Sequence, residues 1–232
     1  MAKEVTLVVG VGPGLGAALA RRFAEGGFAV AVAARDGGKL ADLARAIGGR
    51  AYACDATDAA SVDRLFEDVR RDLGAPSVAI YNAGAYAPGA VIDIEAAAFE
   101  RCWRILCLGG FLVGQRAARH MAEAGRGTIL FTGATASLRG GANFANLAVG
   151  KFGLRAVAQS MARELGPKGV HVAHVIIDGQ IHSERYAHLE KERAPDGLLD
   201  PAAIAETYWQ IHSQPRSAWT LELDLRPWVE KF

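Results

Sequence analysis

Short apolar segments alternate along the chain with longer segments of helical periodicity, and this alternation constrains the fold more than any other feature. The apolar segments, rich in Val, Ile and Ala, span residues 5–10, 28–33, 50–54, 77–82, 127–132, 170–177 and 219–225. The helical patterns span about residues 15–25, 38–46, 58–72, 97–123, 144–165 and 201–212. Near-continuous apolar strands are typical of a parallel sheet covered on both faces. Since right-handed crossovers join parallel strands, the pattern predicts an α/β fold with a doubly wound, seven-stranded parallel sheet between two layers of helices.

The length and net charge of the chain predict its number of domains and the class of partner that it binds. The 232 residues contain no repeat and no linker, which predicts one domain over residues 1–232. The formal net charge is +1, with 26 Lys and Arg against 25 Asp and Glu. Such a balance supplies no broad basic field for nucleic acid or an anionic membrane. We therefore expect a small-molecule substrate, and neither nucleic acid nor membrane, as partner.

Two further features bear on the cellular setting. The apolar run near the N-terminus is interrupted by Gly and Pro before it reaches the length of a signal-peptide core or a spanning helix, which predicts a cytoplasmic protein. Cys54, Cys102 and Cys107 form no C-x-x-C pair, so we expect neither a disulfide framework nor a metal site.

A long irregular stretch, residues 179–200, follows a predicted strand and is polar and charged. Segments of this kind are often mobile lids over a site. A solvated surface loop is an equally good interpretation of the composition.

The turn after the first predicted strand is rich in glycine. Gly10, Gly12, Gly14 and Gly16 lie between that strand and the first helical pattern. A backbone that turns sharply into a helix needs residues without Cβ, and the helix N-terminus attracts phosphate. A Gly-rich turn in this context predicts a Rossmann-type fold that binds a dinucleotide.

The residues at the end of the second predicted strand indicate which dinucleotide the chain would bind. In such folds an acid at this place holds the ribose hydroxyls of NAD(H), whereas an arginine suits the 2′-phosphate of NADP(H). Here Ala34 takes the place of the acid and Arg35 follows it, so we expect NADP(H) rather than NAD(H). An ion pair between Arg35 and Asp36 is the alternative. Asp55, with Ala56 beside it, follows the third strand and is placed to accept a hydrogen bond from adenine.

With these features the sequence resembles the short-chain dehydrogenase/reductase family over essentially its whole length. The resemblance rests on the Gly-rich turn, Asp55, "YNAG" at 81–84, Lys151 and the segment around 178–183. It implies an oxidoreductase fold in which three segments hold the cofactor. They are the turn with Gly10, Gly14, Leu15 and Gly16, the segment Asn82, Ala83 and Gly84 beneath the adenosine ribose, and the nicotinamide cradle with Gly179, Ile181 and Ser183.

The family's catalytic group comprises Ser, Tyr, Lys and Asn, and the resemblance implies that most of it is replaced. Taking Lys151 as the family's lysine, the tyrosine position four residues upstream is Leu147 and the serine position is Ala134. Alignment of the preceding long helix places Leu106 at the asparagine position. The tyrosine is the family's proton donor, and leucine cannot donate a proton. This chain is therefore identified as a divergent member that lacks the Ser-Tyr pair.

Other residues could supply part of the chemistry. Lys151 would hold the ribose hydroxyls, since an unpaired lysine in so apolar a helix would be costly; a surface lysine is the alternative. Thr135 and Ser137 lie near the serine position, and His182 is a candidate acid beside the nicotinamide.

Three hypotheses about function remain open at this point. The first is an NADP(H)-dependent oxidoreductase with an atypical site, acting on an unknown carbonyl or alcohol. The second is a catalytically inactive NADP(H)-binding homologue that acts as sensor, scaffold or partner subunit. The third is the fold without the cofactor. The resemblance also implies a homodimer or homotetramer.

Overall fold

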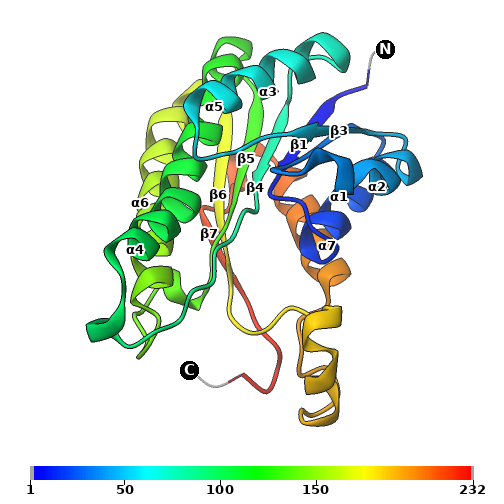
Figure 1. Ribbon diagram of the computed structural model, residues 1–232. Coiled ribbons are helices and arrows are strands. Elements are labelled where there is room, and N and C mark those ends of the chain that lie inside the picture. Colours follow the sequence, from blue (N-terminus) through cyan, green and yellow to red (C-terminus); the bar gives the residue numbers. More distant parts are fainter. Residues whose placement is uncertain (1–2, 231–232) are drawn as a thin grey trace.

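One parallel sheet runs through the protein (Figure 1). The structure, a computed structural model, describes residues 3–230; residues 1–2 and 231–232 of the predicted domain lie outside the described residues, as does the side chain of Arg185. The seven strands follow the order β3-β2-β1-β4-β5-β6-β7, and every neighbouring pair is parallel. They are β1 (Val5–Val9), β2 (Ala29–Ala34), β3 (Arg50–Ala53), β4 (Val78–Tyr81), β5 (Gly127–Thr132), β6 (Val170–Ile177) and β7 (Glu222–Leu225). The predicted doubly wound, Rossmann-type sheet is confirmed.

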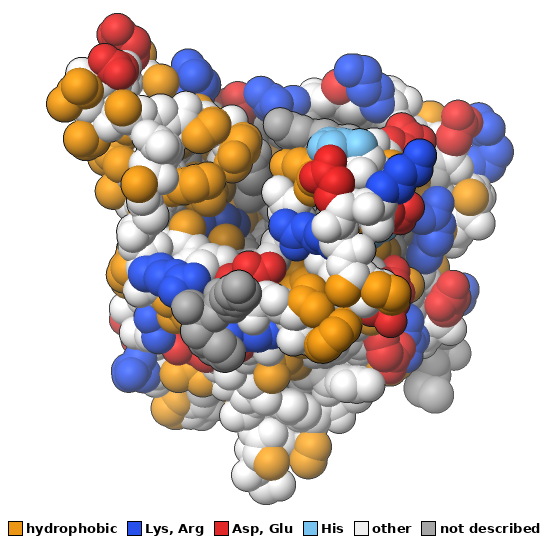
Figure 2. Space-filling model, turned by 90° about the horizontal axis from the view of Figure 1, so that it is seen from below, with side chains coloured by type: hydrophobic (Ala, Val, Ile, Leu, Met, Phe, Trp, Pro, Cys, Tyr) orange, Lys and Arg blue, Asp and Glu red, His pale blue; other side chains and the backbone are white. Residues whose placement is uncertain are grey.

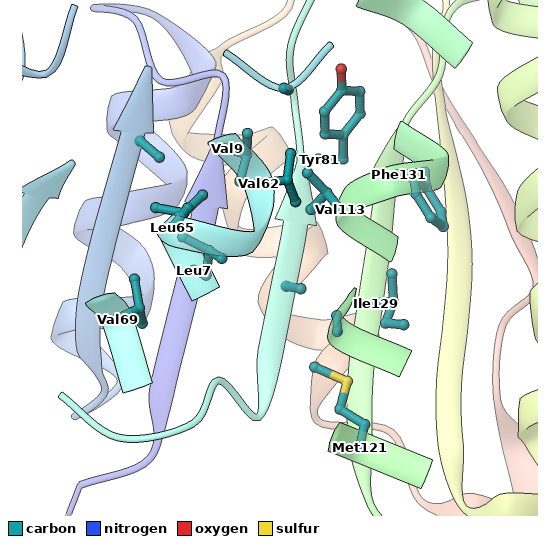
Figure 3. Close-up of a cluster of buried hydrophobic side chains, with 14 of the residues drawn as sticks. Leu7, Val9, Val62, Leu65, Val69, Tyr81, Val113, Met121, Ile129 and Phe131 are labelled. Carbon is teal, nitrogen blue, oxygen red and sulfur yellow. The ribbon is translucent and has the colours of Figure 1, made fainter. Parts of the chain in front are cut away.

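Helices cover both faces of this sheet. They are α1 (Leu15–Glu25), α2 (Ala41–Ala46), α3 (Ala59–Asp72), α4 (Ala96–Trp103), α5 (Gly109–Ala124), α6 (Ala145–Leu165) and α7 (Pro201–His212). Side chains of α3, α5 and α6 meet one face of the sheet in a first apolar cluster, part of which is drawn in Figure 3. Side chains of α1, α2 and α7 meet the other face in a second cluster. Because helices cover both faces of the central strands, successive side chains of these strands are buried on alternate faces. The sequences of these strands are therefore near-continuous runs of Val, Ile, Leu and Ala.

The strand order places the site. The chain winds outward from β1 to β2 and β3, then returns to β4 on the other side of β1. Val9 at the end of β1 is level with Ala33 on one side and Tyr81 on the other. The loops that leave these strands therefore start at one edge and diverge, which makes the crevice where open α/β sheets bind ligands.

The predicted helix over 97–123 is interrupted in the structure. Residues Arg104–Leu108 form a π-helical segment, η3, between α4 and α5. The Tyr81 hydroxyl, at the end of β4, donates a short hydrogen bond to the carbonyl oxygen of Ile105. A side chain that binds a carbonyl within the helical ladder is a usual cause of such an irregularity. Periodicity in a single segment could not reveal this contact, because it comes from a distant strand.

Two other boundaries differ from the sequence prediction. The last strand begins at Glu222 instead of residue 219, because Arg216–Ala218 form a 3₁₀ turn and Trp219 stacks on His171 with ring centroids 4.8 Å apart. Within residues 179–200, Ile181 bridges Leu199, and Glu184–Lys191 form a 3₁₀ helix, η6, which extends below α7 in Figure 1. In residues 3–230 we find no helix with both the length and the apolar character that a membrane span requires.

The N-terminus of α3 provides a test of local stability. Asp58 caps this helix, since its carboxylate accepts hydrogen bonds from the amides of Ala60 at 3.1 Å and Ser61 at 3.2 Å. We predict that Asp58→Ala lowers the free energy of unfolding by about 0.5–2 kcal/mol, measured by urea denaturation. Glu67→Ala, at an exposed position of the same helix, is the matched control. Equal effects of the two substitutions would contradict the capping role.

Candidate functional site

The Gly-rich turn is shaped by two close backbone contacts. Gly10 has a positive φ of +88°, and a Cβ there would collide with the backbone of Ala83. A Cβ on Gly16 would lie 2.7 Å from the Cα of Val11. Glycine is therefore required at both places for the turn to close against β4 and against itself. Gly12 and Gly14 differ, because their Cβ positions have no neighbour within 4 Å and face open space.

The first helix, α1, begins at this open space, and no side chain binds the amide groups at its N-terminus. Gly14 is the N-cap of α1, no side chain caps the helix, and its first turn holds no acidic residue. The N-terminal amides of a helix have no partner within the helix and carry partial positive charge. Together with the space beside Gly12 and Gly14, this arrangement fits the pyrophosphate of a dinucleotide.

Two cavities adjoin the turn, and both are lined by Val11, Gly12, Ala34 and Arg35. The smaller, about 230 Å³, reaches the strand ends of β3 and β4, where its lining includes Asp55, Ala56, Ala83 and Gly84. The larger, about 870 Å³, runs between α1 and α2, and Arg21 and Lys39 add positive charge to it. The structure thus brings most of the predicted cofactor residues of the first half of the chain to the lining of these two cavities.

Arg35 is exposed and free to face a ligand. Asp36 lies 3.5 Å from the Lys39 ammonium, and within residues 3–230 no ion pair of Arg35 is found. Asp55 accepts hydrogen bonds from the Thr57 amide at 2.9 Å and the Thr57 hydroxyl at 2.8 Å. These bonds, with the nearby Arg35 charge, lower the pKa of the Asp55 carboxyl, which keeps it an acceptor.

Asn82 connects the turn to the middle of the sheet. Its Nδ2 donates to the carbonyl oxygen of Gly10 at 3.1 Å, and its Oδ1 accepts from the Thr132 hydroxyl at 3.1 Å. The side chain therefore ties the strand ends of β1, β4 and β5 together. In this structure Asn82 supports the turn, while Ala83 and Gly84 line the cavity.

Lys151 is buried within the sheet-facing side of α6 and is only 5% exposed. Its Nζ donates to the carbonyl oxygen of Thr132 at 2.6 Å, at the carboxyl end of β5. Burial lowers the pKa of the ammonium to about 8. The surface-lysine alternative is therefore wrong for this residue, and its charge lies at the edge where the cofactor residues gather.

The three residues that the sequence analysis aligned with the family's Tyr, Ser and Asn are apolar. Leu147 lies one helical turn before Lys151 and is half-buried, as is Ala134 after β5. Leu106 is fully buried in η3. A Cβ on Gly150 of α6 would lie 2.5 Å from the Cβ of Leu106. The isobutyl group of Leu106 therefore packs on the backbone of α6.

His182 lies at the outer part of the crevice. Its imidazole is about half exposed, and Nε2 lies 2.5 Å from Glu190 Oε1 in η6. It lines a separate cavity of about 490 Å³ with Arg193 and Asp196. The structure thus pairs this histidine with a carboxylate of its own segment, and it does not bring the imidazole into the lining of the two cavities beside Arg35.

The nicotinamide cradle expected from the resemblance follows β6. Gly179 has φ +143°, and a Cβ there would lie 2.8 Å from Pro227 Cδ of the C-terminal segment. Ile181 is held by its bridge to Leu199, and Ser183 is partly buried at the start of η6. This segment is thus backed by Pro227, which follows β7. Seen from this edge of the sheet, the surface is hollowed beside a projection rich in hydrophobic side chains (Figure 2).

Sequence reasoning missed one polar contact at this edge. The Thr135 hydroxyl donates a short hydrogen bond to Asp178 Oδ1, and Asp178 Oδ2 lies 3.5 Å from Arg226 Nη2. Within residues 3–230 no three His, Cys, Asp or Glu side chains gather closely enough to hold a metal ion.

Comparison with known proteins identifies relatives along most of the chain. Residues 4–193 match the family described as short chain dehydrogenase. The 3-oxoacyl-[acyl-carrier-protein] reductase MabA of Mycobacterium tuberculosis is 35% identical over 193 residues, covering 83% of this chain and 75% of the relative. The mitochondrial (-)-isopiperitenol/(-)-carveol dehydrogenase of Mentha piperita is 32% identical over 229 residues, covering 96% and 83%. A crystal structure of a short-chain dehydrogenase from Rhodopseudomonas palustris, 42% identical, superposes with a TM-score of 0.83 and covers 97% of this chain and 99% of that one.

The buried Lys151 ammonium predicts a stability effect that depends on pH. The pKa of Lys151 is about 8 in the folded protein against 10.5 ordinarily, so the unfolded chain binds more protons between these values. The free energy of unfolding of the wild type should therefore rise with pH, relative to Lys151→Met, by up to about 3 kcal/mol across this range. Urea denaturation at a series of pH values measures the difference. The exposed Lys168→Met is the control, and a constant difference for Lys151→Met would contradict the burial of a charge.

Proposed function

The chain belongs to the short-chain dehydrogenase/reductase family, and from this premise we propose that it is an NADP(H)-dependent oxidoreductase with an atypical active site. Its substrate would be a small carbonyl compound or alcohol. The observation that carries the proposal is a pair of cavities that share Gly12 and Arg35 in their lining. One extends between α1 and α2, and the other extends to Asp55 and Ala83.

The chain's residues fit a nicotinamide dinucleotide. Gly12, Gly14 and the amides that begin α1 suit the pyrophosphate, while Asp55, Ala56, Ala83 and Gly84 line the space for the adenosine. The positively charged Arg35, Arg21 and Lys39 line the larger cavity and favour a 2′-phosphate. When bound, the cofactor would supply hydride transfer.

Lys151 would serve as the ribose anchor at the inner end of the site. Its ammonium already donates to Thr132 O and keeps further hydrogens for ribose hydroxyls. Gly179, Ile181 and Ser183 would border the nicotinamide, with segment 179–200 as a lid over it. His182 is the candidate acid among the residues of this lid, and its Nε2 lies 2.5 Å from Glu190 Oε1.

A catalytically inactive homologue is the second candidate. The observation that favours it is the set of apolar side chains, Ala134, Leu147 and Leu106, at the positions that the resemblance assigns to the family's Ser, Tyr and Asn. Such a protein would bind NADP(H) through the same cavities and act as sensor, scaffold or partner subunit.

We further propose a cytoplasmic homodimer or homotetramer. The exposed apolar side chains of Phe111 on α5 and of Val149 and Phe152 on α6, each 37–43% exposed, support self-association through these helices.

Arg35 provides the test of cofactor choice. Arg35→Ala should weaken NADPH binding about 10–100-fold and leave NADH binding unchanged, because only NADPH carries the phosphate that the guanidinium would bind. Calorimetric titration of both cofactors measures this. Arg71→Ala, which removes an exposed arginine paired with Asp68 and Asp72 outside the lining of both cavities, is the matched control. Equal losses for both cofactors would contradict the phosphate contact, and no binding of either would contradict the whole proposal.

Turnover decides between the two candidate functions. The oxidoreductase proposal predicts that the untouched protein converts at least one member of a panel of carbonyls and alcohols, followed by nicotinamide absorbance. The rate should fall on Lys151→Ala. An inactive homologue would bind NADPH without turnover, and Ala134→Ser combined with Leu147→Tyr would then give at most weak activity.

A further inference from the structure

Two polar side chains from neighbouring strand ends lie in direct contact at the carboxyl edge of the sheet. Thr135 begins the turn after β5, one residue beyond Ala134, and Asp178 directly follows β6. The Thr135 hydroxyl donates a short hydrogen bond to Asp178 Oδ1. Neighbouring parallel strands hold these two strand ends side by side, since Thr132 is level with Val175. The contact is thus built by the most ordered part of the fold.

The exposure of the two side chains is unequal. Asp178 is only 5% exposed, whereas Thr135 is partly exposed. One carboxylate oxygen faces the Thr135 hydroxyl, and the other faces Arg226 at 3.5 Å. The hydroxyl is therefore the more exposed member of the pair, and the carboxylate lies behind it.

The surroundings of this carboxylate include one positively charged side chain. Arg226, from the segment after β7, faces Oδ2, and the same guanidinium binds Asp224 of β7. Because Thr135 gives its hydrogen to the carboxylate, its oxygen keeps its lone pairs for a donor on the open side. An alcohol O–H is such a donor.

The pair also lies where the reaction would take place. Thr132 O, three residues before Thr135, holds the Lys151 ammonium, and Gly179, which follows Asp178, begins the nicotinamide cradle. A substrate oxygen between the lysine and the cradle would therefore meet the strand end that carries Thr135.

We propose that Thr135 and Asp178 carry the proton of the reaction in place of the missing Ser-Tyr pair, and that the substrates are alcohols to be oxidised. The inference rests on the proposed oxidoreductase function. An oxidised nicotinamide cofactor, when bound, would accept the hydride of the substrate carbon. The alcohol proton would then pass to Thr135 Oγ1 while the Thr135 proton passes to Asp178 Oδ1. The C=O bond forms as the C–H and O–H bonds break, and Asp178 ends protonated. Reduction runs the same transfers backwards. Thr135 touches the substrate, and Asp178 is the positioning residue and proton acceptor behind it.

Near-isosteric substitutions test the relay. Thr135→Val removes the hydroxyl and should lower kcat by about 10²–10⁴-fold, while Thr135→Ser keeps the hydroxyl and should retain most of the rate. Asp178→Asn can still accept the Thr135 hydrogen bond but cannot take up a proton, so it should lower kcat with KM and NADPH affinity preserved. Thr207→Val and Asp93→Asn, on α7 and at an exposed turn, are matched controls. A merely structural contact would tolerate Asp178→Asn.

A second readout needs neither cofactor nor turnover. Carbon-13 NMR detects labelled aspartate carboxyls, and the Asp178 signal is assigned by its loss in Asp178→Asn. The chemical shift of this signal should change in Thr135→Val and remain the same in Thr207→Val. A signal that does not respond to Thr135→Val overturns the pair.

The outcomes separate this proposal from the one it rests on. An active wild type whose Thr135→Val or Asp178→Asn variant keeps its rate overturns the relay alone. Loss of rate in His182→Ala with a retained rate in Thr135→Val also overturns it, in favour of the imidazole. A wild type that binds NADPH and oxidises no alcohol overturns the relay, and if it also reduces no carbonyl the oxidoreductase function fails with it.

Discussion

The carboxyl end of β5 depends on one residue, Thr132, which joins both helical layers to the middle of the sheet. Its hydroxyl donates to Asn82 Oδ1, and the Tyr208 hydroxyl of α7, at 2.8 Å, therefore donates to Thr132 Oγ1. Its carbonyl oxygen accepts from the Lys151 ammonium of α6. Thr132, Tyr208 and Lys151 are buried, so each of these polar groups would be costly to leave without its partner. The Gly-rich turn is held indirectly by the same residue, because Asn82 also binds Gly10 O.

The buried charge of Lys151 influences the polar groups beneath it. His174 of β6 is fully buried, and its pKa is lowered to about 4 by burial and by the nearby lysine, so its imidazole is neutral at ordinary pH. Its Nε2 lies 3.3 Å from the Ser137 hydroxyl, and its ring fills the place where Gly133 would carry a Cβ. Arg155, one turn after Lys151 on α6, holds Glu222 through bonds of 2.6 and 2.8 Å and lowers the pKa of that carboxyl to about 2. The positive charge of Arg155 on α6 is thus compensated by Glu222 of β7.

Most of the fold was predictable because its signals are local. Seven strands appear where apolar runs were found, and the helices follow the predicted periodic segments, with α7 matching its prediction at Pro201 and His212. The errors occur where a distant contact overrides a local preference. The Tyr81 hydroxyl binds the Ile105 carbonyl within η3, where the predicted helix is interrupted. Trp219, which was predicted to begin the last strand, stacks on His171 instead. Among the candidate site residues, Gly10 and Gly16 were predictable because their signal is also local. Glycine is the one residue type without a Cβ, and the close turn leaves no space for a Cβ at either position.

Residue types and their spacing alone determined the doubly wound sheet, the Gly-rich turn after β1 and the family resemblance, because each depends on patterns within one short segment. Only the tertiary structure decided that Lys151 is buried against Thr132, that Asp36 turns to Lys39 and leaves Arg35 to the cavity, and that His182 pairs with Glu190. It alone brought Thr135 to Asp178, which are 43 residues apart in the chain. Such contacts form between side chains of different strand ends and loops, and their distances are set by the packing of the whole sheet.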